Sequence, residues 1–173
     1  MESHPDTQLI VFPELAVTGY QCGENFKDLA ETAMIDSTSI KKMNALAKEF
    51  HVHIVYGMAE KEEDILYNSQ FFLDDTGVLL GTYRKVHLFD SEKNYFTPGD
   101  QFKVFNTKIG RIGLFICYDA FFPEAARSLA IQGVDLLVNS TNWEKPYDYD
   151  IAKQMKHDYY TMLTERRPDV YIA

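Results

Sequence analysis

Short apolar runs alternate along the chain with segments whose apolar residues recur every three or four positions. Residues 9–12 and 52–58 are apolar and rich in β-branched side chains, so they predict buried strands. Residues 37–50, which lie between them, predict a helix with Ser37 as its cap. The apolar residues of this helix share one face: Ile40, Met43, Leu46, Ala47 and Phe50.

Two hairpins are expected in the middle of the chain. The first joins residues 66–73 to residues 78–86 through the sequence DDTG at 74–77, whose residue types favour a tight turn. The second joins a strand at residues 102–105 to a strand at residues 108–117 through a turn at Asn106-Thr107.

The last third of the chain continues the alternation. Pro123, which suits a first helical turn, opens a helix that Gly133 closes. The elements expected after it are a strand at 134–139, a polar helix at 149–164 and a β-type run at 170–173. Strands that alternate with helices predict an α/β layered fold. Because the chain starts and stops in apolar β-type runs, we expect a fragment of a larger domain.

Composition excludes several classes of protein. The chain has 173 residues, of which 46% are hydrophobic, enough for a sizeable core in one domain. Its net charge of -9 and lack of a basic run argue against nucleic acid as a partner. No apolar run reaches membrane-spanning length and no signal peptide begins the chain, so a cytoplasmic protein without a membrane partner is expected. Two cysteines without CxxC spacing predict neither a disulfide scaffold nor a metal site, and no cofactor is expected.

One of these cysteines, Cys117, lies where the apolar strand ending at Ile116 gives way to the helix that begins at Pro123. A thiol near the partly positive end of a helix is favoured as thiolate, which is the nucleophilic form. Free cysteines are also among the most buried residue types, so a small core residue fits the same position. The segment alone leaves both interpretations open.

Two further polar residues occupy comparable places. Glu14 follows the strand at 9–12, at the kind of strand end where α/β folds carry functional groups, although most glutamates are exposed loop carboxylates. Lys85 lies late in the strand at 78–86, with Arg84 on the opposite face by alternation, and a solvated edge lysine is the alternative. Glu92 lies in the loop that follows, and its spacing alone assigns it no role.

Three sequence blocks carry a resemblance to a known family. They are LIVFPELAVTGY around Glu14, YRKVHLF around Lys85 and LFICYDAFFPEAAR around Cys117. In this order they resemble the three signature blocks of the nitrilase superfamily of carbon-nitrogen hydrolases. The similarity extends over essentially the whole chain, including SEKNYFTPGD and GVDLLVNSTNW. Three blocks in order, each with the expected Glu, Lys or Cys, are hard to explain by chance.

The resemblance implies an α-β-β-α sandwich over residues 1–173 that is incomplete at both ends. The family's N-terminal strand and helix and its C-terminal strands are absent from this chain. Family members dimerise through helices that include the one after the cysteine, so the complete protein is expected to be a homodimer or higher homo-oligomer. A fragment with exposed sheet edges is expected to be poorly stable and inactive by itself.

The resemblance also implies a mechanism for hydrolysing an amide or N-carbamoyl amide to an acid and ammonia or an amine. Glu14 would be the general base that takes the proton of Cys117, whose thiolate forms a thioester with the substrate. Lys85 and the backbone N–H of Tyr118 would stabilise the oxyanion. Glu92 would support the site by orienting Lys85 or the hydrolytic water.

The substrate is less well defined than the chemistry. Tyr118 and Asp119 follow the cysteine, a pattern more similar to amidases and carbamoyl-amide hydrolases than to true nitrilases, which typically have tryptophan and glutamate there. Asn142 and Trp143 follow the next strand and are expected to shape the substrate pocket. The alternatives are a nitrile-hydrolysing enzyme, an amidase domain that feeds a synthetase, a thiol redox sensor and a non-catalytic interaction module.

Overall fold

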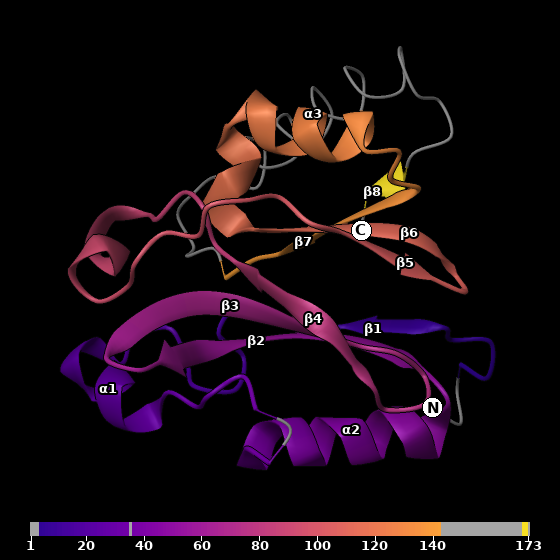
Figure 1. Ribbon diagram of the computed structural model, residues 1–173, viewed down its shortest axis with the longest axis horizontal. Coiled ribbons are helices and arrows are strands. Elements are labelled where there is room, and N and C mark those ends of the chain that lie inside the picture. Colours follow the sequence, from indigo (N-terminus) through magenta and orange to yellow (C-terminus); the bar gives the residue numbers. More distant parts are fainter. Residues whose placement is uncertain (1–3, 35, 143–170, 173) are drawn as a thin grey trace.

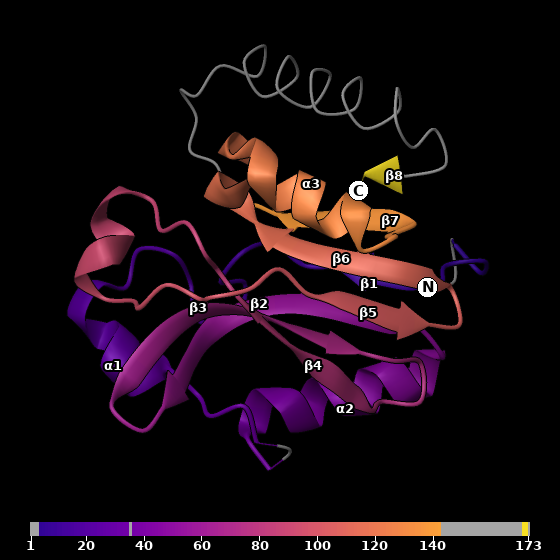
Figure 2. The same cartoon turned by 45° about the horizontal axis from the view of Figure 1, so that its top comes forward.

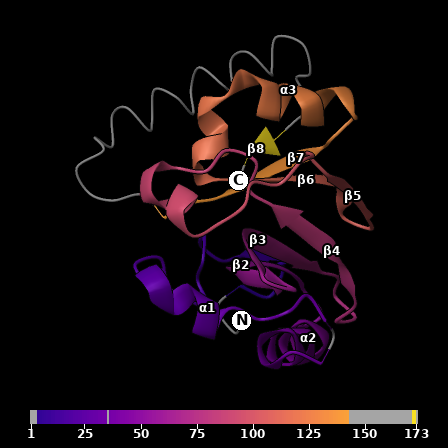
Figure 3. The same ribbon diagram turned by 60° about the vertical axis from the view of Figure 1, so that its left-hand side comes forward.

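The computed structural model describes residues 4–34, 36–142 and 171–172, which form two stacked four-stranded sheets flanked by helices (Figure 1). One sheet has the strand order β1-β2-β3-β4 and the other β5-β6-β7-β8. Helix α2 covers the outer face of the first sheet and α3 that of the second, as the turned views also show (Figure 2, Figure 3). The predicted α/β sandwich with α-β-β-α layers is confirmed.

The first sheet consists of β1 (Leu9–Val11), β2 (His53–Glu62), β3 (Ile65–Leu73) and β4 (Leu79–Arg84). Strand β1 pairs with β2 in parallel, and the other two pairings are antiparallel, so β4 runs in the same direction as β1. The expectation that the first strand is buried is wrong. In the described part of the sheet β1 is an edge strand: Leu9 and Ile10 pack against the cores but are only partly buried, and Val11 is exposed.

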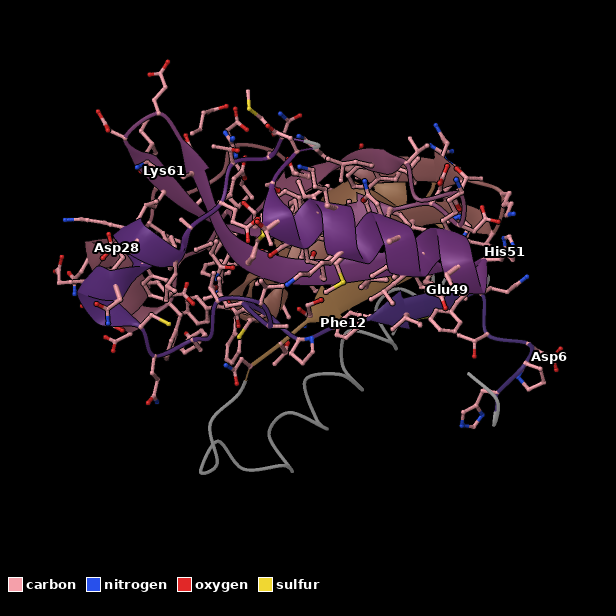
Figure 4. All side chains as sticks on the ribbon, turned by 90° about the horizontal axis from the view of Figure 1, so that it is seen from below. Asp6, Phe12, Asp28, Glu49, His51 and Lys61 are labelled. Carbon is pink, nitrogen blue, oxygen red and sulfur yellow. The ribbon has the colours of Figure 1, made fainter. Side chains whose placement is uncertain are left out.

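Helix α2 (Thr38–Phe50) lies across the outer face of this sheet, seen from below in Figure 4. Ile40 and Ala47 are fully buried against it, whereas Leu46 and Phe50 are 39% and 42% exposed. The predicted apolar face is therefore wider than the stripe that contacts the sheet. Ser37 occupies the N-cap position, but its side chain makes no capping hydrogen bond. Figure 4 labels His51 at the other end of the helix, which it closes in a left-handed conformation.

The hairpin of β3 and β4 turns at residues 74–77, as predicted. The Asp74 backbone N–H donates to Val78 O at 2.9 Å, and Gly77 has a φ of +81° that glycine adopts without strain. The pairing is irregular at one place, because Phe72 faces Gly81 while Leu73 faces Leu79. One extra residue of β4 therefore forms a bulge near the turn.

The second sheet consists of β5 (Val104–Thr107), β6 (Gly110–Ile116), β7 (Leu136–Ser140) and β8 (Tyr171–Ile172), and α3 (Pro123–Ile131) covers it. The prediction that the β5–β6 turn lies at Asn106-Thr107 is wrong, since both residues belong to β5. The turn falls at residues 108–109, because the Thr107 hydroxyl accepts from Ile109 N–H and donates to Gly110 O. The polar helix predicted at 149–164 lies outside the described residues.

The main core lies between the two sheets and continues under α3. Its buried members include Val55, Phe72, Ile112, Leu114 and Val138. Strands β6 and β7 are parallel, so their carboxyl ends lie at the same end of the second sheet. The carboxyl ends of β1 and β4 likewise lie at the same end of the first sheet, because these two strands run in the same direction. Within the described residues, α2 and the other helices are too short or too polar to cross a lipid bilayer.

Candidate active site

Glu14, Lys85 and Cys117 each follow the carboxyl end of a strand. Glu14 comes shortly after β1, Lys85 directly after β4 and Cys117 directly after β6. All three are buried, and Lys85 has no exposed surface. Neither the exposed carboxylate nor the solvated lysine that surface statistics favour is therefore found.

The Lys85 ammonium is the centre of the site. Its Nζ lies 2.6 Å from Oε1 of Glu14 and 2.8 Å from Oε1 of Glu92, so one cation pairs with two carboxylates. Glu92 is carried by the short 3-10 helix η2 (Asp90–Asn94) and is itself buried. Buried charges are tolerated when they are paired and hydrogen-bonded, and this cluster meets both conditions.

Cys117 begins the 3-10 helix η3 (Cys117–Phe121) with a φ of +43°, a conformation that is uncommon for residues other than glycine. Its thiol group is near enough to Lys85 for the attraction between them to help raise the pKa of Lys85. The structure thus brings together Glu14, Lys85 and Cys117, the three residues that the sequence singles out, along with Glu92.

The charged groups of this cluster shift one another's pKa values. Burial lowers the pKa of Lys85, but attraction to Glu14, Glu92 and Cys117 outweighs it, so the pKa is raised and the ammonium stays charged. Burial is also the largest influence on Glu14, and repulsion from Glu92 acts in the same direction. Attraction to Lys85 only partly opposes them, so the pKa of Glu14 is raised above its usual value. A carboxyl group with a raised pKa is suited to both accept and return a proton.

Glu14 has two partners that the sequence did not indicate. Asn68 of β3 donates from Nδ2 to Oε1 of Glu14 at 2.8 Å, and the backbone N–H of Asn142 donates to Oε2 at 3.2 Å. The signal available for Asn68 is that it begins a run of three polar residues, Asn68 to Gln70, in the middle of a strand that is otherwise apolar. Asn142 itself is exposed, so its predicted role in the substrate pocket rests on position alone, and Trp143 lies outside the described residues.

Glu92 is held by three donors. Its Oε1 accepts from the Tyr20 hydroxyl at 2.8 Å as well as from Lys85, and its Oε2 accepts from the Phe89 backbone N–H at 2.9 Å. The pKa of Tyr20 is raised by burial and by the neighbouring Glu92, so its hydroxyl keeps the proton that it donates. Tyr20 belongs to the first motif block, but sequence reasoning assigned it no role.

A close approach of two backbones places Glu14. A Cβ atom added to Gly57 of β2 would lie 2.5 Å from the backbone nitrogen of Leu15 and 3.0 Å from Pro13 O. Only glycine fits at this distance, because both neighbours are backbone atoms that cannot turn aside. Leu15 has a φ of +51°, so the chain bends sharply just after the carboxylate.

Tyr118, the residue directly after Cys117, packs among aromatic rings. The Tyr118 ring contacts Phe89 and Phe121 with ring centroids 5.0 Å apart in both pairs. Cys22 is a free, half-buried thiol that donates to Thr18 O at 3.1 Å. No group of three His, Cys, Asp or Glu residues within the described part of the chain is arranged to hold a metal ion.

Comparison with known proteins identifies the family. Residues 1–162 match the family model of the carbon-nitrogen hydrolases. The chain belongs to the carbon-nitrogen hydrolase family. It is 48% identical over 161 residues to a probable nitrilase from Schizosaccharomyces pombe, covering 90% of this chain and 59% of that protein. It is 40% identical over 140 residues to N-carbamoylputrescine amidase from Solanum tuberosum, covering 77% of this chain and 47% of that protein.

A solved structure of a carbon-nitrogen hydrolase from Helicobacter pylori is similar in fold. It matches with a TM-score of 0.78 at 31% identity, covering 95% of this chain and 58% of that one. This carbon-nitrogen hydrolase chain therefore spans about half the length of the curated relatives it matches. The resemblance carried by the three motif blocks is confirmed at the level of family and fold.

Proposed function

We propose that the protein to which this chain belongs hydrolyses the carbon-nitrogen bond of a small amide or N-carbamoyl amide through a thioester on Cys117. The observation that carries this proposal is the Lys85 ammonium, which has no exposed surface and pairs with Glu14 and Glu92 beside the thiol. A scaffold gains nothing from burying three ionisable side chains around a thiol. Hydrolysis of an unreactive amide needs a nucleophile, a proton shuttle and a fixed positive charge.

In the first half-reaction Glu14 takes the proton from the Cys117 thiol, and the thiolate attacks the carbonyl carbon. The carbonyl oxygen of the tetrahedral intermediate carries the negative charge, and the Lys85 ammonium and the Tyr118 backbone N–H stabilise it. Glu14 then donates its proton to the nitrogen as the carbon-nitrogen bond breaks. Ammonia or an amine leaves, and the acyl group remains as a thioester.

In the second half-reaction Glu14, again a carboxylate, takes a proton from water, whose oxygen attacks the thioester. The carbon-sulfur bond breaks, the acid leaves, and Glu14 returns the proton to the thiolate. The raised pKa of Glu14 supports this shuttle, because the proton is neither released too readily nor held too tightly.

Glu92 is best suited to anchor Lys85. Both of its oxygen atoms already accept hydrogen bonds, from Lys85 and Tyr20 at Oε1 and from Phe89 N–H at Oε2. These contacts favour orientation of the ammonium over activation of the hydrolytic water, the other role that the family resemblance allows.

The substrate class is inferred from the residues after the nucleophile and from the relatives. Tyr118 and Asp119 favour an amide or carbamoyl amide, in agreement with the similarity to N-carbamoylputrescine amidase. Nitrile hydrolysis is the second candidate, because the probable nitrilase is the relative with 48% identity.

Replacement of Cys117 in the full-length protein tests the proposal. Cys117→Ala and Cys117→Ser should lower hydrolysis of amides, N-carbamoyl amines or nitriles by at least about a thousandfold. Cys22→Ser, which removes the other thiol of residues 1–173, is the matched control and should retain the parent rate. Undiminished hydrolysis by Cys117→Ala would rule out the covalent mechanism.

A second experiment examines the intermediate. Glu14→Gln lacks the base that serves both half-reactions. Alkaline pH ionises the Cys117 thiol without that base but does not replace it in activating water, so mass spectrometry after mixing with substrate at alkaline pH should detect an acyl adduct on Cys117. Absence of any adduct over a range of pH would count against the thioester. Comparison of amide and nitrile substrates in the same assay separates the two candidate functions.

A further inference from the structure

Asp119 is a buried carboxylate to which the proposed reaction assigns no part. It has no exposed surface and lies two residues after the nucleophile, in η3. Its Oδ2 accepts from the Tyr83 hydroxyl at 2.7 Å and from the Ile116 backbone N–H at 3.0 Å. Its Oδ1 accepts from the His87 backbone N–H at 2.8 Å and lies 2.9 Å from His87 Nδ1.

These partners have a pattern along the chain. Tyr83 lies two residues before Lys85 and His87 two residues after it, while Ile116 directly precedes Cys117. One carboxylate therefore connects the backbone before the nucleophile with both sides of the segment that carries the cation. The two segments belong to different sheets, β4 to the first and β6 to the second.

The turn at Cys117 needs such support. A residue other than glycine with a φ of +43° is strained and persists only where its surroundings fix the backbone. The bond from Ile116 N–H to Asp119 spans this residue and closes the turn on itself. The His87 ring stacks on Phe122 with centroids 3.7 Å apart, which fixes the far end of η3 to the same segment.

We propose that Asp119 is a positioning residue that sets the distance and orientation of the Cys117 thiol relative to the Lys85 ammonium across the two sheets. The inference rests on the proposed function of Cys117, which it deepens. A displacement of about 1 Å between reacting groups lowers a rate by about a hundredfold, so loss of Asp119 should act on the chemical step and leave substrate binding nearly intact.

The test compares Asp119→Asn with the full-length parent, both with Cys22→Ser so that Cys117 is the one thiol left within residues 1–173, and modification is read on the peptide that contains Cys117. Two quantities are measured on folded protein: kcat and KM for an amide that the parent hydrolyses, and the rate and pH dependence of alkylation of Cys117 by iodoacetamide. We expect kcat to fall about a hundredfold with KM within about threefold, and alkylation to slow about tenfold with an altered pH profile. Asp75→Asn is the matched control, since Asp75 is also buried and pairs with Lys108 at the opposite end of the β3–β4 hairpin.

The outcomes separate the two proposals. Parent values of kcat and alkylation in Asp119→Asn would overturn the positioning role, and so would an equal loss in Asp75→Asn. If Asp119→Asn does not fold, Tyr83→Phe decides, because it removes one donor and keeps the carboxylate. It should slow alkylation about tenfold, and a parent rate would overturn the inference. A parent protein that hydrolyses no amide, yet loses alkylation in Asp119→Asn, would contradict the proposed function alone.

Discussion

In the full-length protein, replacement of Lys85 by methionine should destabilise the folded state strongly at neutral pH. The ammonium has no exposed surface and pairs with Glu14 and Glu92 at 2.6 and 2.8 Å, so the variant leaves two buried carboxylates without their shared cation. Removal of one partner from a buried ion pair costs about 3–5 kcal/mol. For a domain with a total stability of about 5–15 kcal/mol, this is a large share.

The loss should depend on pH in a defined direction. Without Lys85, burial and repulsion act on Glu14 unopposed, so its pKa in the folded state lies further above the unfolded value than in the parent. A raised carboxyl pKa stabilises the folded protein below the unfolded pKa, and this contribution is lost as pH rises through the folded pKa. The deficit in Lys85→Met should therefore be smaller at pH 5 than at pH 7.5.

Urea unfolding at both pH values measures the effect. Lys27→Met is the matched control, because Lys27 pairs with Glu24 on the surface, where both side chains are largely exposed. Its free energy of unfolding should equal that of the parent. The reasoning would be refuted by a Lys85→Met variant as stable as Lys27→Met at pH 7.5, or by a deficit that does not shrink at pH 5.

Two further predictions concern Glu14. Burial and repulsion from Glu92 raise its pKa, so the apparent pKa of the acidic limb of kcat/KM should lie above the usual glutamate value of about 4.3. Glu92→Gln removes the repulsion and should lower this apparent pKa in a pH–rate profile. Gly57→Ala should lower kcat about a hundredfold, because the new Cβ would displace the backbone at Leu15 and with it the carboxylate. Gly113→Ala is the control for Gly57→Ala: its Cβ would meet only side chains, at 3.1 Å or more, so it should lower the thermal midpoint and leave kcat unchanged.

Sequence patterns predicted the features that depend on neighbouring residues. The turn at 74–77 forms as expected because Asp74 bonds within its own turn, to Thr76 and Val78. Alternation placed Arg84 and Lys85 on opposite faces: Arg84 pairs with Glu60 at 2.6 Å, and Lys85 faces the site. The second turn was placed too early because the Thr107 hydroxyl, and not the turn propensity of Asn106, decides where that hairpin bends.

Features that depend on contacts between distant segments could not be predicted. The bond from Asn68 to Glu14 joins residues 54 positions apart, and the bond from Tyr20 to Glu92 joins residues 72 positions apart. The three contacts of Asp119 with Tyr83 and His87 likewise join residues 32 or 36 positions apart and arise only when the two sheets stack, whereas its bond from Ile116 N–H is local. The three motif blocks single out the residues to which the proposed chemistry is assigned, whereas the residues that hold them in place have no local signal.

The bulge between β3 and β4 determines which basic side chain enters the site. Arg84 and Lys85 are consecutive, and each is neutralised by carboxylates on its own side of the sheet. Side chains alternate between faces, so a shift of one position between the bulge and Lys85 would exchange the two. The site would then receive a planar guanidinium in place of a compact ammonium. The length of the turn can therefore be changed in a redesign of this hairpin. Residues added to or removed from β4 between the bulge and Lys85 must come in even numbers, so that Lys85 stays on the face of the site.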